Sequence, residues 1–186
     1  MRGTLTVVAA VAAVTVLGVV QTTTASPGDH GRGGGDHGGG TVLRFDTMAP
    51  VTEPFTGADH AIRGVPGGGL PWELDEARGR LRDDGRLDVR VEGLVLARRA
   101  PVPDAAQGTN PVPQFRAAVN CLTVPPADAA DTALADSGMT VLSDPVPASP
   151  EGDARIRAQL TLPQPCIAPI VFVTSPTGAW FAVTGR

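Results

Sequence analysis

The residues best suited to acid–base chemistry form one short cluster, Trp72-Glu73-Leu74-Asp75-Glu76. Glycosidases use a pair of carboxylates close to the sugar that they cleave. In a strand, Glu73 and Asp75 would point to the same face about 7 Å apart, near the separation that inverting enzymes use. Acidic side chains at exposed strand ends are also common without any function. A secreted, glycosidase-like hydrolase using Glu73, Asp75 and Glu76 is therefore the alternative function, not the first.

Other catalytic patterns are absent from the sequence. No serine lies in a Gly-x-Ser-x-Gly elbow, and His60 is the only histidine outside the Gly-rich N-terminal stretch. The three glycines Gly67, Gly68 and Gly69 are followed by Leu-Pro rather than by the Lys-Thr of a phosphate-binding loop. We expect no catalytic residue, no metal site and no cofactor, and thus a protein that is not an enzyme.

Residues 1–25 have the pattern of a secretory signal peptide. Arg2 supplies positive charge, Leu5–Val20 is an apolar run, and Thr23 and Ala25 are small residues suited to a cleavage site. The run is shorter than the roughly 20 residues that span a bilayer, which disfavours a retained anchor. We expect a secreted protein, extracellular or associated with the cell wall, with no transmembrane helix in its mature form.

Residues 26–40 read SPGDHGRGGGDHGGG, and a stretch so rich in glycine is expected to be a disordered linker. It contains two Asp-His pairs, Asp29-His30 and Asp36-His37, whose side chains can ligate a transition metal. Nothing preorganises these ligands, so the sequence favours a solvated spacer and leaves metal binding by the repeat open.

Cys121 and Cys166 are the only two cysteines. They form neither a Cys-x-x-Cys pair nor a set of zinc ligands. Because secretion would place both in an oxidising compartment, we predict that they form a disulfide.

Charge and composition restrict the partners. All 15 basic residues are arginine, the formal net charge is −4, and only 4% of the residues are aromatic. An acidic chain with few aromatic rings has no evident means of binding nucleic acid or an anionic membrane. We expect an unknown extracellular or cell-envelope partner.

The remaining sequence, residues 41–186, predicts a single all-β domain. Apolar and polar residues alternate in short segments that Pro-rich and Gly-rich connections separate, which favours an antiparallel β-sandwich, immunoglobulin-like or jelly-roll, of about 8–10 strands. A short helix at Ala127–Ala135 is the single helical candidate. The expected strands are Val42–Phe45, His60–Val65, Leu70–Leu74, two within Ala77–Gly93, Gln114–Thr123, Met139–Leu142, Asp153–Leu162, Ile170–Thr174 and Ala179–Thr184.

Two hairpins allow a prediction of register. A three-residue loop, Asp83–Gly85, would pair Leu81 with Leu87 and place glycine at the left-handed position that such loops need. It would also gather arginines on one outer face. Such a face could bind a polyanion, but Asp83, Asp84 and Asp88 interrupt it, and the sequence favours a merely solvated face. The arginines concerned are Arg78, Arg80, Arg82, Arg86 and Arg90.

The second hairpin turns at Ser175–Gly178, with proline and glycine placed as in a type I turn. An even-length loop there pairs Phe172 with Phe181 and Val173 with Trp180. This register makes Trp180 a core residue rather than a platform for a ligand.

The segment Gly64–Trp72 is the candidate recognition loop. Gly67, Gly68 and Gly69 would let a backbone approach closely, and Trp72 would offer a large contact area. The alternative is that the glycines cross the end of the sheets while Trp72 fills the core, because tryptophan is mostly buried in small domains.

The run Arg63–Trp72, together with Gly93–Leu96, Asn110-Pro111, Val119–Cys121 and Glu151–Ala154, resembles segments of small secreted proteins of high-GC bacteria. The resemblance covers most of residues 45–185. It implies secretion and a shared domain plan, and because no activity is attached to that group it adds no site residue. The leading hypothesis is a secreted, non-enzymatic domain that binds a partner outside the cell or at the envelope.

Overall fold

A computed structural model of the protein describes residues 40–124 and 138–185. The predicted signal peptide, residues 26–39 of the predicted linker and the predicted helix at Ala127–Ala135 lie outside the described residues. No helix in the described part is long and apolar enough to cross a membrane. Apart from one short 3-10 helix, the regular secondary structure of the described part consists of antiparallel strands joined by long loops.

Four strands form one sheet in the order β1-β4-β5-β10. Along each strand, alternate side chains point to opposite faces, so Leu81, Leu87 and Val89 are buried while the charged residues between them face solvent. The sheet thus has one apolar and one charged face. Its members are β1 (Thr41–Phe45), β4 (Glu76–Arg82), β5 (Arg86–Glu92) and β10 (Ala154–Gln159).

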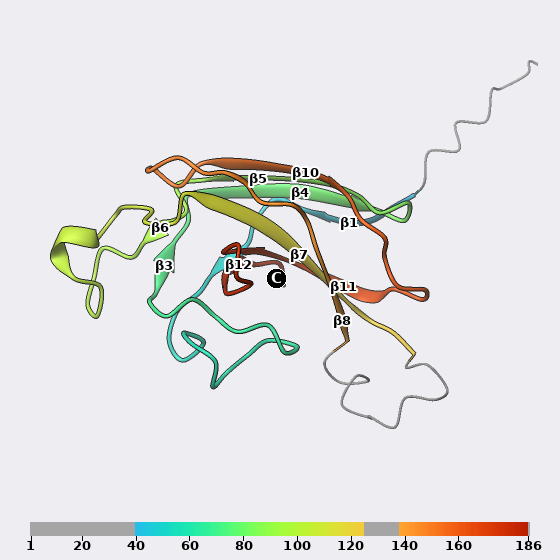
Figure 1. Ribbon diagram of the computed structural model, residues 1–186, viewed down its shortest axis with the longest axis horizontal. Helices are drawn as coiled ribbons and strands as arrows, with labels where there is room; N and C mark the ends of the chain where they lie inside the picture. The colour runs from blue at the N-terminus through green and yellow to red at the C-terminus, as the bar shows by residue number, and fades with distance from the viewer. Residues whose placement is uncertain (1–39, 125–137, 186) are drawn as a thin grey trace, which may run out of the picture. The chain divides into compact units, whose positions relative to one another are not determined.

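The second sheet follows the order β2-β12-β11-β7-β8, with β9 also paired to β7. Figure 1 shows β10, β5, β4 and β1 as one layer beside a second layer that contains β7, β11 and β12. This arrangement confirms the predicted all-β antiparallel sandwich. The members of the second sheet are β2 (Ala49–Pro50), β7 (Gln114–Leu122), β8 (Met139–Leu142), β9 (Val146–Pro147), β11 (Ile167–Thr174) and β12 (Trp180–Val183).

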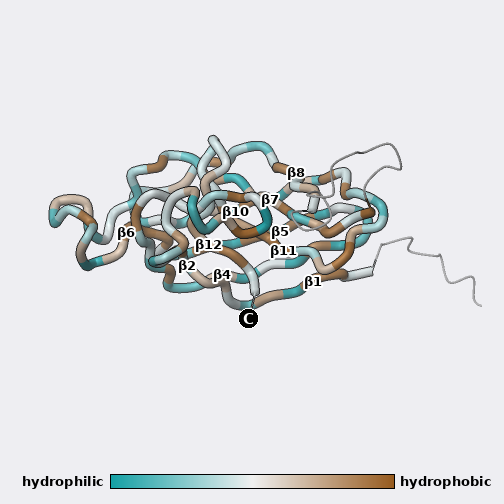
Figure 2. The backbone as a smooth tube through the Cα atoms, turned by 90° about the horizontal axis from the view of Figure 1, so that it is seen from below, coloured by the Kyte–Doolittle hydropathy of each residue, from teal (hydrophilic) through white to brown (hydrophobic). Residues whose placement is uncertain are grey.

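The core lies between these layers and is built from hydrophobic residues, whose positions along the backbone are coloured brown in Figure 2. At its centre the Trp72 ring stacks on Phe181 with ring centroids 4.0 Å apart, and both rings meet Phe115 edge-on. Trp72 belongs to a two-stranded ladder of β3 (Trp72–Glu73) and β6 (Val95–Leu96). A short 3-10 helix, η1 (Asp104–Ala106), follows this ladder along the chain.

The predicted disulfide is confirmed. Cys121 at the end of β7 is bonded to Cys166, which directly precedes β11, with the two Cα atoms 4.9 Å apart. The bond joins neighbouring strands of the same sheet, since β7 and β11 are paired.

The longer predicted strands are present, but the one predicted at His60–Val65 is wrong. Arg63 and Gly64 both adopt left-handed backbone conformations, with φ of 48° and 77°. They form a tight turn in which Ile62 and Val65 exchange backbone hydrogen bonds of 3.0 Å. Extended structure cannot continue through two left-handed residues, so this segment folds back on itself.

The first hairpin has the predicted register, with Leu81 opposite Leu87, Ala77 opposite Val91 and a left-handed Gly85. Its glycine is also needed for space, because a Cβ there would lie 1.8 Å from the carbonyl oxygen of Leu160.

The predicted register of the last hairpin is wrong. Thr174 pairs with Trp180, whereas Val173 pairs with Ala182, so a bulge lies at Phe181. Gly178 is left-handed, with φ of 99°, and Ser175 donates a backbone hydrogen bond to Ala179, so an odd loop of three residues replaces the predicted even-length loop and Thr174 meets Trp180 instead of Ala179. The extra residue of β12 is then absorbed in the bulge. Trp180 is nevertheless buried, as predicted.

Candidate functional site

The carboxylate cluster does not form the predicted pair on one strand. β3 ends at Glu73 and β4 begins at Glu76, and the two strands belong to different sheets. Glu73 accepts hydrogen bonds from the backbone N–H of Arg98 and from its guanidinium, at 3.0 and 3.1 Å. Asp75 and Glu76 are exposed, and Glu76 pairs with Arg78. Asp75 lies between β3 and β4, so the three acids do not share the single strand on which the glycosidase hypothesis depended.

The candidate recognition loop is largely buried. Trp72 is only 3% exposed, so the alternative of a core tryptophan is correct and its predicted role as a contact is wrong. A Cβ on Gly67 would lie 1.9 Å from the carbonyl oxygen of Phe55, and one on Gly68 would lie 3.0 Å from the Phe181 ring. These two glycines allow the chain to pack closely against itself; Gly69 alone of the three is exposed.

The strongest concentration of chemistry-bearing side chains lies on the solvent side of the four-stranded sheet. We call this surface the arginine face. More than half of the chain's 15 basic residues are there, although the chain as a whole carries a formal charge of −4. The arginine face consists of Arg44 from β1, Arg78, Arg80 and Arg82 from β4, Arg86 and Arg90 from β5, and Arg155 and Arg157 from β10.

Few carboxylates share this face. On the four strands, eight arginines stand against Glu76, Asp88 and Glu92, which leaves a formal charge of +5. Counting Asp46 and Asp84 at the strand ends still leaves +3. The arginine face is therefore positive in an acidic protein.

The strand register places arginines directly opposite one another. Arg44 is paired with Arg80 across β1 and β4, and Arg90 is paired with Arg78 on one side and Arg155 on the other. Side chains at directly opposite positions lie about 5 Å apart at Cβ, and like charges there are destabilising. Three such pairs on one sheet call for a compensating interaction.

Ion pairs compensate only part of this charge. Arg78 pairs with Glu76, Arg90 with Glu92 at 2.7 Å, and Arg82 approaches Asp84 at 3.7 Å. Three arginines of the face form no ion pair with any described residue. They are Arg44, Arg80 and Arg86.

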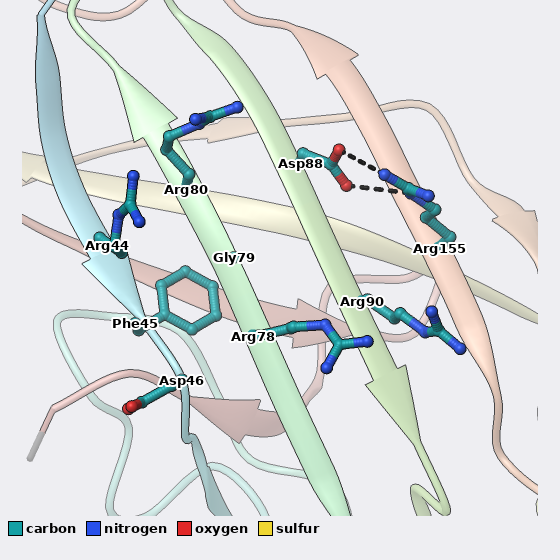
Figure 3. A pocket seen from close by; sticks show the side chains of 9 residues that line it. All are labelled: Arg44, Phe45, Asp46, Arg78, Gly79, Arg80, Asp88, Arg90 and Arg155. Atoms are coloured by element: carbon teal, nitrogen blue, oxygen red, sulfur yellow. Dashed lines mark hydrogen bonds and ion pairs between the residues drawn. The ribbon is translucent and has the colours of Figure 1, made fainter.

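Asp88 lies in the middle of the arginine face. Its carboxylate accepts two hydrogen bonds from the Arg155 guanidinium, at 2.8 and 3.2 Å (Figure 3). It also lies 3.6 Å from the guanidinium of Arg157. The hydrogen bonds from Arg155 hold the pKa of Asp88 below its ordinary value. Partial burial opposes this shift, and the charges of Arg155, Arg157 and Arg80 add to it. Asp88 thus stays ionised and fixes the arginines of β10.

Two hollows lie on the arginine face. The first, the Arg44 hollow, has a volume of about 750 Å³, and the second, the Arg86 hollow, of about 460 Å³. Both are lined by Arg80 and Asp88, so they adjoin there. The other residues that line the Arg44 hollow are Phe45, Asp46, Arg78, Gly79, Arg90 and Arg155. Those that line the Arg86 hollow are Arg82, Leu87, Arg157, Ala158 and Gln159.

Guanidinium groups outnumber the carboxylates of Asp46 and Asp88 in the lining of these hollows. The described residues contain no group of three or more His, Cys, Asp or Glu able to hold a metal. Arginine binds phosphate, sulfate and carboxylate groups through paired N–H donors. The arrangement is chemically suited to holding anions.

Sequence reasoning found the arginines of the hairpin but not the whole face. Arg155 and Arg157 show the alternation of a half-exposed strand, yet nothing local indicates that β10 pairs with β5. Arg44 likewise joins the face only through the pairing of β1 with β4. Pairing between segments distant in the chain creates the charge density.

Comparison of the chain with known protein families, with curated proteins and with solved structures found no match. The resemblance to small secreted proteins of high-GC bacteria therefore stays a prediction.

Proposed function

We propose that this protein is a secreted, non-enzymatic domain that binds an anionic partner outside the cell or at the cell envelope, through the arginine face. The observation that carries the proposal is the like-charge pair of Arg44 and Arg80, which lie directly opposite each other across the sheet and form no ion pair with any described residue, whereas Arg78, Arg90 and Arg155 are each ion-paired. A solvated face gains nothing from such pairs, whereas a bound anion turns their repulsion into shared attraction. The disulfide is consistent with an oxidising compartment.

The glycosidase-like alternative is not proposed. Glu73 is held by Arg98, and Asp75 and Glu76 are exposed and do not line either hollow of the arginine face. No observation in the described part of the chain favours hydrolysis.

The export part of the proposal is tested by N-terminal sequencing of protein recovered from the culture medium. Cleavage after Ala25 would leave Ser26 as the first residue. An intact N-terminus in a membrane fraction would contradict export by signal-peptide cleavage.

The binding part is tested with immobilised dextran sulfate and uncharged dextran as paired surfaces. We expect binding to dextran sulfate alone, weakening as NaCl rises. If the three arginines without an ion pair are the principal contacts, each releases about 0.7 of a counterion, and a rise in NaCl from 50 to 200 mM should weaken binding about 18-fold.

A matched pair of double variants locates the site. Arg44→Gln with Arg80→Gln removes two charges from the face, and Arg98→Gln with Arg99→Gln removes two charges elsewhere. We expect the first variant to lose most of the affinity and the second to keep it. Equal losses would show that binding follows net charge, and absence of binding at 50 mM NaCl would refute the proposal.

A further inference from the structure

The arrangement of the two hollows points to the shape of the anion. The Arg44 hollow and the Arg86 hollow share Arg80 and Asp88, so they adjoin on the arginine face, and we call the pair of them the trough. Along β5, from Arg90 to Arg86, the strand rise gives this trough a length of about 13 Å. A single phosphate or sulfate ion would occupy only a small part of it.

The three arginines without an ion pair lie at successive places in the trough. Arg44 and Arg80 are directly opposite each other on β1 and β4. Arg86 is the diagonal neighbour of Arg80 on β5, because Arg80 pairs with Asp88 two residues further along. Such diagonal neighbours lie about 7–8 Å apart. A ligand that satisfies all three must carry several separate charges.

The charge of Asp88 does not block the trough. Asp88 stands where the two hollows meet, but Arg155 and Arg157 both pair with it and balance its charge. Arg80, on its other side, has no ion pair in the described part of the chain. A chain of anionic groups can therefore pass Asp88 on the Arg80 side.

The trough lacks the features that bind nucleobases. Proteins that hold single-stranded nucleic acid stack successive bases on aromatic side chains. The one aromatic residue in the lining, Phe45, lies against Gly79, where a Cβ would be 2.4 Å from its ring, and no ring lines the Arg86 hollow. The trough therefore offers guanidinium, carboxylate and amide groups rather than a series of aromatic rings.

We infer that the ligand of the arginine face is a linear, non-nucleotide polyanion with repeated phosphate or sulfate groups, which spans both hollows. This inference rests on the proposed function and adds the ligand class and its extended binding mode. Guanidinium groups at several points bind such a chain by multiple charge-assisted hydrogen bonds, so affinity should grow steeply with chain length.

The test uses the full secreted chain and two lengths of inorganic polyphosphate, triphosphate and a long polymer, in solution at 50 mM NaCl. Arg44→Gln alters only the Arg44 hollow and Arg86→Gln only the Arg86 hollow. Each variant should weaken binding of the long polymer about five- to tenfold, from the loss of one ionic contact. Triphosphate should bind at least 100-fold more weakly than the polymer and respond to one of the two variants only. Arg99→Gln, off the face, should leave both affinities unchanged.

The outcomes separate the two proposals. If the long polymer responds to one variant only, or triphosphate binds as well as the polymer, the face holds a compact anion; the extended mode is then refuted while anion binding stands. If neither probe binds at all, the proposed function fails as well. Dextran sulfate in place of polyphosphate distinguishes a sulfated glycan from a phosphate polymer as the source of the charge. Equal or tighter binding of oligo(dT) of matched charge would overturn the non-nucleotide conclusion.

Discussion

Replacing Trp72 by alanine tests whether this residue belongs to the core or to a binding surface. A buried tryptophan removes about 150–250 Å² from water, which at about 25 cal/mol/Å² corresponds to about 4–6 kcal/mol. Measured losses for such truncations are about 3–5 kcal/mol because the site relaxes in part. With Trp72 at 3% exposure and stacked on Phe181, we expect a loss of about 4 kcal/mol and a fall of roughly 15 °C in Tm.

Urea denaturation measures this change with the disulfide intact. Trp180, the only other tryptophan, is 2% exposed and serves as the fluorescent reporter in the variant. Trp72→Phe is the control, since it keeps an aromatic ring on Phe181 and should lose markedly less. Below the transition, Trp72→Ala should bind dextran sulfate like the unchanged protein. A Tm that barely moves together with lost binding would refute the core assignment and restore the recognition loop.

Three further predictions follow from the same structure. Reduction of the disulfide, whose cysteines are 45 residues apart, should lower the free energy of unfolding by about 4 kcal/mol on the chain-entropy estimate; an unchanged urea midpoint would contradict this. Gly57→Ala should cost about 1 kcal/mol for its left-handed backbone alone, with φ of 79° and nothing near the new methyl group. Gly85→Ala has a similar φ of 83° and should cost clearly more, because its methyl group would lie 1.8 Å from a carbonyl oxygen; equal urea-derived losses would count against that collision. The pKa of Asp88 is lower in the folded protein than in the unfolded chain, so its ionised carboxylate stabilises the fold, by under about 1 kcal/mol because the ion pair is exposed. This stabilisation is fully present above the pKa of the unfolded chain and is lost as the pH falls through the pKa of the folded protein, below about pH 4. Arg155→Gln should raise that pKa in a carboxyl NMR titration, and an unmoved titration curve would exclude Arg155 as its cause.

The parts of the fold that follow from local chemistry were predictable. Alternation along β4, β5, β7 and β10 identified the long strands, and Asp83–Gly85 determined the register of their first hairpin. Two-residue strands such as β2 and β9 carry no alternation to detect. The turn at Arg63 was not predicted, because nothing in the sequence indicates that an arginine adopts a left-handed backbone conformation. Its turn depends on contacts with distant residues, including its 2.8 Å hydrogen bond to Ala168.

The candidate site was predictable only in part, for a related reason. A hairpin defines two strands of a sheet, so five arginines of the face were visible from one segment of sequence. Their neighbours from β1 and β10 come from segments far away in the chain, which pair only in the folded sheet. The carboxylate cluster failed in the opposite way: Glu73 and Asp75 looked like neighbours on one strand because they are close in sequence, but β3 ends at Glu73 and Asp75 lies between β3 and β4.

Net charge does not argue against the proposed anionic partner, for a physical reason. A formal charge of −4 describes the field far from the molecule, but at 0.15 M salt that field is screened within about 8 Å. A polyanion that reaches the surface responds to the charges within that distance. On the arginine face these sum to between +3 and +5, and the rest of the chain is correspondingly more acidic. Because the rest of the chain is acidic on balance, it would repel a polyanion more than the arginine face does, and so would add orientation to binding rather than oppose it. On this reasoning, replacing acidic residues far from the face should increase non-specific polyanion binding and leave the contribution of Arg44 and Arg86 unchanged.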